Sequence, residues 1–211
     1  MSRVLIACEF SGIVRRAFAA LGHDAWSCDL LPAEDRSNHH IIGDLRDHLA
    51  DGWDLLIVCH PPCTRLCNSG VRWLSAPPRG RTLHEMWADL DAGAALFSDC
   101  WNAPVERIAV ENPVMHRHAK ARIRNYQEPS QSIQPWQFGD AEAKRTCFWL
   151  KNLPPLVPTH STRPETVVHR VWRMPPGPDR QKERSRFFPG VAAAMAEQWG
   201  DAAPAMREAA E

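Results

Sequence analysis

A cysteine follows two prolines at the end of a short apolar segment, an arrangement typical of a reactive thiol. The residues are Asp54-Leu-Leu-Ile-Val-Cys-His-Pro-Pro-Cys63. Because proline fixes φ and lacks an N–H, the turn at His60-Pro61-Pro62-Cys63 should be stiff and hold the sulfur in one direction. We expect Cys63 to attack a flat, electron-poor ring, although a buried structural cysteine is the commoner fate of a single Cys.

The segments around this turn predict strands that alternate with helices. Apolar runs at 4–8, 24–28, 54–59 and 107–111 predict strands, and helical spacing is found at 13–21 and 84–101. This alternation, with strands apolar throughout, is typical of a parallel, doubly wound sheet. Ligands of such sheets bind at the carboxyl ends of the strands. We therefore expect one crevice to gather Gly12, Asp29, Asp44, Cys63 and Glu111.

The rest of the chain predicts a less regular C-terminal half. Segments 132–138 and 146–150 resemble strands, a short helix is expected over 45–49, and a closing helix over 191–199. Ten of the 18 prolines lie from Pro129 to Pro189. We predict a catalytic and cofactor-binding domain at 1–150, a loop-rich substrate-recognition segment at 151–186, and a helical segment at 187–211 that returns to the catalytic domain.

Composition excludes several classes of protein. The 211 residues include 25 basic and 25 acidic side chains, so net charge favours neither nucleic acid nor membrane. No apolar run approaches the roughly 20 residues of a transmembrane helix, and seven irregularly spaced cysteines indicate reduced thiols rather than a disulfide framework. We expect a soluble, cytoplasmic protein with no membrane partner.

Three features of the first half suggest a nucleotide-like cofactor. The turn Phe10-Ser11-Gly12 precedes a helix and would offer free backbone N–H groups, although a lone Gly is often only a turn. Asp29 ends a strand, where a carboxylate holds ribose hydroxyls or serves as an ordinary loop acid. Asp44 would accept a hydrogen bond from an adenine amino group or cap the helix that follows, and capping is the favoured interpretation.

These elements, together with Pro61-Pro62-Cys63 and Glu111-Asn112, resemble the DNA cytosine-5 methyltransferase family in that family's motif order. Phe10-Ser11-Gly12 resembles its first cofactor motif, Asp29 its ribose-binding acid and Asp44 its adenine contact. Phe188-Pro-Gly190 weakly resembles its last motif. The resemblance spans residues 4 to about 150 and this last segment, and the combination is far more specific than Pro-Pro-Cys alone.

The resemblance implies a class I S-adenosylmethionine-dependent methyltransferase fold and a covalent mechanism on DNA. Cys63 would add to carbon 6 of a flipped cytosine, and carbon 5 would then take the methyl group from S-adenosylmethionine. Glu111, protonated or sharing a proton near ring nitrogen 3 and with its pKa raised by burial, would offset the developing charge. Lys144 or Arg145 would hold the cytosine carbonyl or a phosphate, unless they form a solvated charge pair. The remaining expected contacts are Pro61 on the cofactor and His60 and Asn112 on the substrate.

The sequence departs from the family pattern in ways that indicate a small, divergent member of phage or bacterial type. Cys59-His60 replaces the usual Gly-Gly, Val14 replaces the second Gly of the cofactor turn, and Pro113 follows Glu-Asn. His60 would tune Cys63, touch substrate or simply pack in its loop. Residues 160–186 carry seven basic and three acidic side chains, which would grip phosphates or form a solvated loop. The expected contacts there are Arg163, Arg170, Trp172, Arg173, Arg180, Arg184 and Arg186.

Three alternatives compete with this interpretation. Cys59, Cys63 and Cys67, with His60, would form a metal cluster, but the prolines break the regular spacing, and we expect no metal site. A second alternative keeps the chemistry and changes the substrate to a free pyrimidine nucleotide or RNA, because the recognition segment is short. A third is a catalytically inactive nucleic-acid-binding relative, against which the presence of both Cys63 and Glu111 argues.

Overall fold

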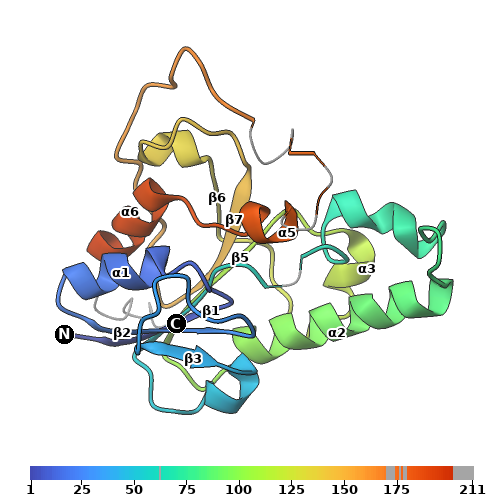
Figure 1. Ribbon diagram of the computed structural model, residues 1–211, viewed down its shortest axis with the longest axis horizontal. Coiled ribbons are helices and arrows are strands. Elements are labelled where there is room, and N and C mark those ends of the chain that lie inside the picture. The colour runs from blue at the N-terminus through green and yellow to red at the C-terminus, as the bar shows by residue number, and fades with distance from the viewer. Residues whose placement is uncertain (62, 170–173, 176, 178–179, 202–211) are drawn as a thin grey trace, which may run out of the picture.

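The computed structural model describes residues 1–201 except 62, 170–173, 176 and 178–179. Seven strands among these residues form one sheet, in the order β3-β2-β1-β4-β5-β7-β6 (Figure 1). The first five strands in this order, β3, β2, β1, β4 and β5, run parallel, whereas β7 is antiparallel to both of its neighbours, β5 and β6. The predicted α/β class with a mostly parallel, doubly wound sheet is confirmed. The strands are β1 (Arg3–Ala7), β2 (Asp24–Asp29), β3 (His40–Ile42), β4 (Leu55–Val58), β5 (Arg107–Asn112), β6 (Gln131–Ile133) and β7 (Thr146–Lys151).

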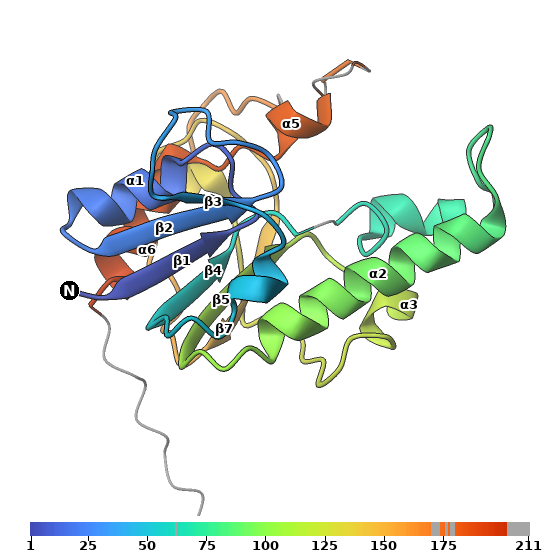
Figure 2. The same cartoon turned by 60° about the horizontal axis from the view of Figure 1, so that its bottom comes forward.

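The central strands are apolar on both sides because helices cover both faces of the sheet. Alternate side chains of β1 and β4 enter two separate cores. One core lies under α1 (Ile13–Ala20) and α6 (Pro189–Trp199), and the other under α2 (Leu83–Trp101) (Figure 2). The predicted helices over 13–21, 84–101 and 191–199 are thereby confirmed to within a few residues.

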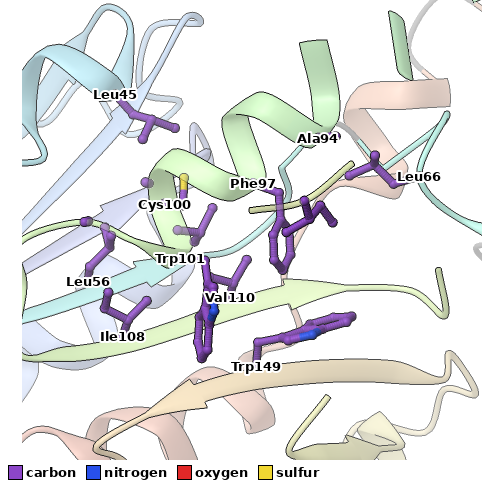
Figure 3. Close-up of a cluster of buried hydrophobic side chains, with 14 of the residues drawn as sticks. Leu45, Leu56, Leu66, Ala94, Phe97, Cys100, Trp101, Ile108, Val110 and Trp149 are labelled. Atoms are coloured by element: carbon purple, nitrogen blue, oxygen red, sulfur yellow. The ribbon is translucent and has the colours of Figure 1, made fainter. Parts of the chain in front are cut away.

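Aromatic packing joins α2 to the antiparallel part of the sheet. Phe97 of α2 and Trp149 of β7 are fully buried and meet edge to face, with ring centroids 5.2 Å apart (Figure 3). At the other end of α2, Thr82 and Glu85 form a reciprocal capping box. The helix is therefore fixed at its start by local hydrogen bonds and near its end by the core.

The strand predicted over 132–138 is wrong beyond Ile133. The chain turns instead into a short 3₁₀ helix, η3 (Pro135–Phe138). Pro135 lacks the N–H that a sheet ladder needs, and Gly139 ends the turn with a φ of 92°, in the left-handed region. The edge strand β6 is consequently only three residues long.

Short elements complete the carboxyl edge of the sheet. They are η1 (Leu45–His48), η2 (Asn68–Leu74), α3 (Arg117–Lys120) and α5 (Arg180–Arg184). The N-terminal part of α2 extends beyond the sheet and, with η2 and α3, forms a lobe beside the strands' carboxyl ends (Figure 2). In the part of the chain that the structure describes, no helix has the length and apolar character needed to cross a bilayer.

Candidate active site

Cys63 lies at the start of a tight turn between β4 and η2. Its carbonyl accepts hydrogen bonds from the N–H groups of Leu66 and Cys67, each at 3.0 Å. Gly70 packs directly against this turn, because a Cβ at that position would lie 1.8 Å from the carbonyl oxygen of Thr64. Cys63 as a whole residue is half-buried.

The segment after β5 holds this turn in place. The N–H of Asn68 donates to the Val114 carbonyl at 3.1 Å, and the N–H of His116 donates to the Leu66 carbonyl at 3.1 Å. The His116 ring reaches the Arg65 carbonyl at 2.6 Å. Residues 113–116 therefore tie the loop after β4 to the end of β5, so that the Cys63 turn is anchored to the strand that carries Glu111.

Glu111 is a buried carboxylate held by two basic groups from different segments. Only 3% of its side chain is exposed, and its oxygens lie 3.3 Å from His60 Nδ1 and 3.6 Å from Lys144 Nζ. Burial by itself would raise the pKa of Glu111, but Lys144 and His60 outweigh it and leave that pKa below its ordinary value. The expected rise in the Glu111 pKa is therefore wrong, because the sequence does not show that a lysine and a histidine flank the acid.

Several buried polar atoms at this point are unpaired among the described residues. His60 Nε2 and both side-chain amide atoms of Asn112 have no hydrogen-bond partner, and Glu111 Oε1 has none beyond its ion pair with Lys144 at 3.6 Å. Burial and the nearby Lys144 lower the pKa of His60, which favours the neutral imidazole, and its Nδ1 lies 3.3 Å from the Glu111 carboxylate. Because unpaired buried polar groups are costly, such a group of donors and acceptors is suited to a polar ligand.

The two basic residues before β7 have different positions. Lys144 reaches Glu111, and its ammonium lies 5.7 Å from the centre of the Phe188 ring. Arg145 is directed to the sheet edge instead, where its Nε donates to Ser132 Oγ at 3.0 Å. Of the two candidates, the structure brings only Lys144 to the site.

A pocket of about 550 Å³ opens beside these residues at the carboxyl ends of β1 and β2. Phe10, Asp29, Asp44 and His60 line it, together with Lys182 of α5. His60 thus borders this pocket on one side and contacts Glu111 on the other. Of the other predicted cofactor contacts, Ser11, Gly12 and Pro61 do not line it.

The N–H groups at the start of α1 are not free, contrary to expectation. The Glu9 carboxylate accepts hydrogen bonds from the N–H groups of Val14 at 2.6 Å and Arg15 at 3.2 Å, and from Ser11 Oγ at 3.3 Å. Glu9 precedes the turn and folds back over it, so a side chain of the protein already occupies the helix N-terminus. Gly12 adopts a φ of 69° there, which accounts for the glycine by backbone conformation alone.

Asp29 and Asp44 differ in how far their carboxylates are already used. Asp29 accepts one hydrogen bond from the N–H of Leu31 at 3.0 Å, and burial raises its pKa. Asp44 caps η1 through the N–H of Arg46 at 3.0 Å and also pairs with the Arg46 guanidinium. The capping interpretation of Asp44 is confirmed, and the same carboxylate borders the pocket.

Two of the seven basic side chains of segment 160–186 pair with one carboxylate outside that segment. Arg186 forms two hydrogen bonds to Glu34, at 2.6 and 2.7 Å, and Lys182 lies 3.3 Å from the same carboxylate. Arg163 is exposed. The Nε of Arg180 donates to the Met174 carbonyl at 2.9 Å. The predicted contacts Arg170, Trp172 and Arg173 lie outside the described residues.

Cys59, Cys63 and Cys67 are not grouped as metal ligands in the described part of the chain. Cys59 is fully buried in the core under α1 and α6. Among the described residues, no three His, Cys, Asp or Glu side chains are grouped as metal ligands.

Three residues of the site were not assigned a role from sequence. A strand-end acid such as Glu9 carries no distinctive sequence signal, and Lys182 lies far along the chain from the pocket it lines. For Cys67 the sequence suggests only the metal-cluster alternative. Its position four residues after Cys63, a spacing that places two side chains on the same face of a helical turn, was the available signal.

Comparisons with known protein families and with curated proteins find no match for this sequence. Solved structures of similar shape share 14% sequence identity with it. One, described as a candidate DNA modification methyltransferase encoded within a prophage (E. coli), has a TM-score of 0.42 over 71% of this chain and 46% of that one. Another, the Dnmt2 methyltransferase of S. pombe, has a TM-score of 0.39 over 81% of this chain and 60% of that one. The chain thus spans about half the length of the first structure.

Proposed function

We propose that this protein is an S-adenosylmethionine-dependent methyltransferase that modifies carbon 5 of cytosine in DNA through a covalent bond to Cys63. The observation that carries the proposal is a group of buried polar atoms on Glu111 and Asn112 that lack a hydrogen-bond partner, close to the turn of the half-buried Cys63. A cytosine edge offers an amino donor and a ring-nitrogen acceptor, which match a carboxylate oxygen and an amide.

The pocket beside His60 fits the cofactor. Its volume of about 550 Å³ lies in the usual range for ligand sites, and its wall carries one aromatic ring and two carboxylates. Asp29 would hold the ribose hydroxyls, Asp44 the adenine amino group, and Phe10 the apolar part of the ligand. When bound, S-adenosylmethionine supplies a methyl group on a positively charged sulfur.

The residues of the chain divide the reaction between them. The Cys63 sulfur forms a bond to carbon 6, and the π electrons of the ring give carbon 5 the nucleophilic character it needs to take the methyl group. The carbon 5 proton then leaves to water, its electron pair re-forms the double bond, and the sulfur leaves carbon 6 as a thiolate. Glu111 is ionised and accepts from the 4-amino group, while the Lys144 ammonium offsets charge that develops on the ring.

A trapping experiment tests this mechanism. Fluorine at carbon 5 cannot leave as a proton does, so duplex DNA with 5-fluorocytosine and S-adenosylmethionine should give an adduct that survives denaturation. Mass spectrometry of the digested adduct should place the bond on Cys63, and the variant Cys63→Ala should give none. Glu111→Gln should form it at least tenfold more slowly.

The same assay separates the alternative substrates. Parallel reactions use RNA with 5-fluorocytosine and the free nucleotide 5-fluoro-dCMP, because the recognition segment is short. We expect the duplex DNA to react fastest. Failure to form an adduct on a library of duplex sequences, while calorimetry shows that S-adenosylmethionine binds, would refute the proposal; an adduct on RNA or on the nucleotide alone would reassign the substrate.

A further inference from the structure

His60 is the point at which the pocket and the candidate catalytic acid meet. It is the second residue after β4, whose pairing with β1 continues through a hydrogen bond from the Cys59 N–H to the Ala7 carbonyl at 2.9 Å. One of its ring nitrogens, Nδ1, lies 3.3 Å from Glu111, and the residue lines the pocket. Lys144, the other basic residue that contacts Glu111, does not line the pocket. His60 therefore links the pocket wall to the carboxylate.

Contacts with two residues fix the direction of the His60 ring. Its centroid lies 5.4 Å from that of the Phe187 ring, at an interplanar angle of 50°. Phe187 is 5% exposed, and only 11% of the His60 side chain is exposed. Because the ring is packed on Phe187 and lies against the Glu111 carboxylate, it has little freedom to turn Nδ1 away from that acid.

The two ring nitrogens of His60 have different surroundings. A neutral imidazole has one N–H group and one lone pair, and a carboxylate beside Nδ1 favours the form with the proton on that nitrogen. Nε2 then carries the lone pair, and it is a buried atom without a hydrogen-bond partner among the described residues. Burial lowers the pKa of His60 and so favours this neutral form over the cation. His60 thus has an unused acceptor whose electron density the Glu111 carboxylate increases.

The proposed cofactor offers a suitable partner for such an acceptor. S-adenosylmethionine carries a positively charged sulfur, and the C–H groups attached to that sulfur are electron-poor. A lone pair attracts C–H groups through weak hydrogen bonds. Transfer of the methyl group leaves the electron pair of the carbon–sulfur bond on sulfur, so the product, S-adenosylhomocysteine, is neutral at this atom and otherwise the same. A group that favours the positive sulfur therefore favours the cofactor over its product.

We propose that His60, supported by Glu111, selects S-adenosylmethionine over S-adenosylhomocysteine by recognising the positive sulfur. The inference rests on the proposed function, because that function names the cofactor. His60 is then a specificity determinant of the cofactor pocket instead of the substrate contact that the sequence predicts. Asp29 and Asp44, which also line the pocket, would contact the ribose and the adenine. Both compounds contain these groups, so the two aspartates do not provide the selectivity.

Calorimetry on the full chain without DNA tests the proposal. The dissociation constants of both compounds are measured for the wild type and for His60→Phe, which keeps a ring against Phe187 but has no lone pair. We expect the variant to bind S-adenosylmethionine about fivefold more weakly, while its affinity for S-adenosylhomocysteine changes less than about twofold. Glu111 does not line the pocket, yet Glu111→Gln should reduce the preference for S-adenosylmethionine about twofold to threefold. In the His60→Phe background, Glu111→Gln should have no further effect on that preference.

A control variant distinguishes charge recognition from a general effect on the pocket. Asp44→Asn changes another residue of the pocket wall and should weaken the binding of both compounds by similar factors. If His60→Phe also weakens both equally, or leaves the affinity for S-adenosylmethionine unchanged, the proposal is overturned. If His60→Phe does not fold, Glu111→Gln decides, and an unchanged preference in that variant overturns the proposal. A wild type that binds neither compound would refute the proposed function as well, whereas binding with an unchanged preference in the variants refutes only the selection by His60.

Discussion

Replacing Lys144 with methionine would leave a buried carboxylate without its cation. The ammonium of Lys144 is 3.6 Å from Glu111, whose side chain is 3% exposed, and Lys144 itself is 17% exposed. At an effective dielectric constant of about 20, two charges at this separation attract by about 4–5 kcal/mol. Breaking buried pairs typically costs about 3–5 kcal/mol. Because Lys144 retains some contact with solvent, we expect Lys144→Met to lower the free energy of unfolding by about 3 kcal/mol at pH 7.

The pH dependence gives this prediction its sign. In the wild type the pKa of Glu111 lies below its ordinary value, so its stabilising effect is present at neutral pH and lost as pH falls through the folded-state pKa. Without Lys144, burial dominates and raises the pKa of Glu111. The variant then gains stability as pH falls from 7 toward 5, while the wild type does not, so the difference between them should shrink on acidification.

Urea denaturation at pH 7 and pH 5.5 measures both effects. Glu111→Gln in the Lys144→Met background should restore most of the lost stability, giving a coupling of about 2–3 kcal/mol in the double-mutant cycle. Lys120→Met is the matched control, because its partner Glu128 is mostly exposed, and it should cost less than about 1 kcal/mol. If Lys144→Met lowers the free energy of unfolding no more than this control, the assignment of Glu111 as an ionised, paired acid is refuted. The same holds if the effects of Lys144→Met and Glu111→Gln on the free energy of unfolding are additive.

Two further predictions concern the turn and the pocket. Gly70→Ala places a Cβ 1.8 Å from the Thr64 carbonyl oxygen and should slow the alkylation of Cys63 by iodoacetamide, followed by peptide mass spectrometry, at least fivefold. Gly177→Ala is the control, because its Cβ would have no neighbour within 4 Å, and it should leave the alkylation rate unchanged. Arg186→Ala removes the guanidinium that pairs with the Glu34 carboxylate and should loosen α5 at the pocket. Calorimetry should then show that S-adenosylmethionine binds about threefold to tenfold more weakly. An unaltered affinity would exclude α5 from the cofactor site.

The fold was predictable because its signals are local and repeated. Each buried parallel strand carries its own apolar run, and each covering helix its own periodicity, so β1, β4, β5, α1 and α2 could be recognised one at a time. The errors occurred where a single residue determines the local structure. Pro135 ended β6 after three residues, and no periodic pattern marks that change.

The members of the site were more predictable than their ionisation. Strand-end positions brought Asp29, Asp44 and Glu111 to the carboxyl edge of the sheet, because topology alone decides where parallel strands end. The pKa of Glu111 could not be predicted in the same way, since it depends on Lys144 and His60 within 4 Å. Burial raises the pKa of an acid at a strand end and neighbouring cations lower it, and only the three-dimensional structure shows which effect is larger.

Charge counted along the sequence also differs from charge available to a partner. Residues 160–186 have a surplus of four positive charges, yet Arg186 and Lys182 both pair with Glu34, which lies outside that segment. Salt dependence of nucleic-acid binding reflects the number of cations that replace counterions on phosphates, and a cation already paired contributes little to it. If this segment binds DNA, its affinity therefore depends on the remaining basic side chains, such as Arg163, because Arg186 and Lys182 are already paired with Glu34.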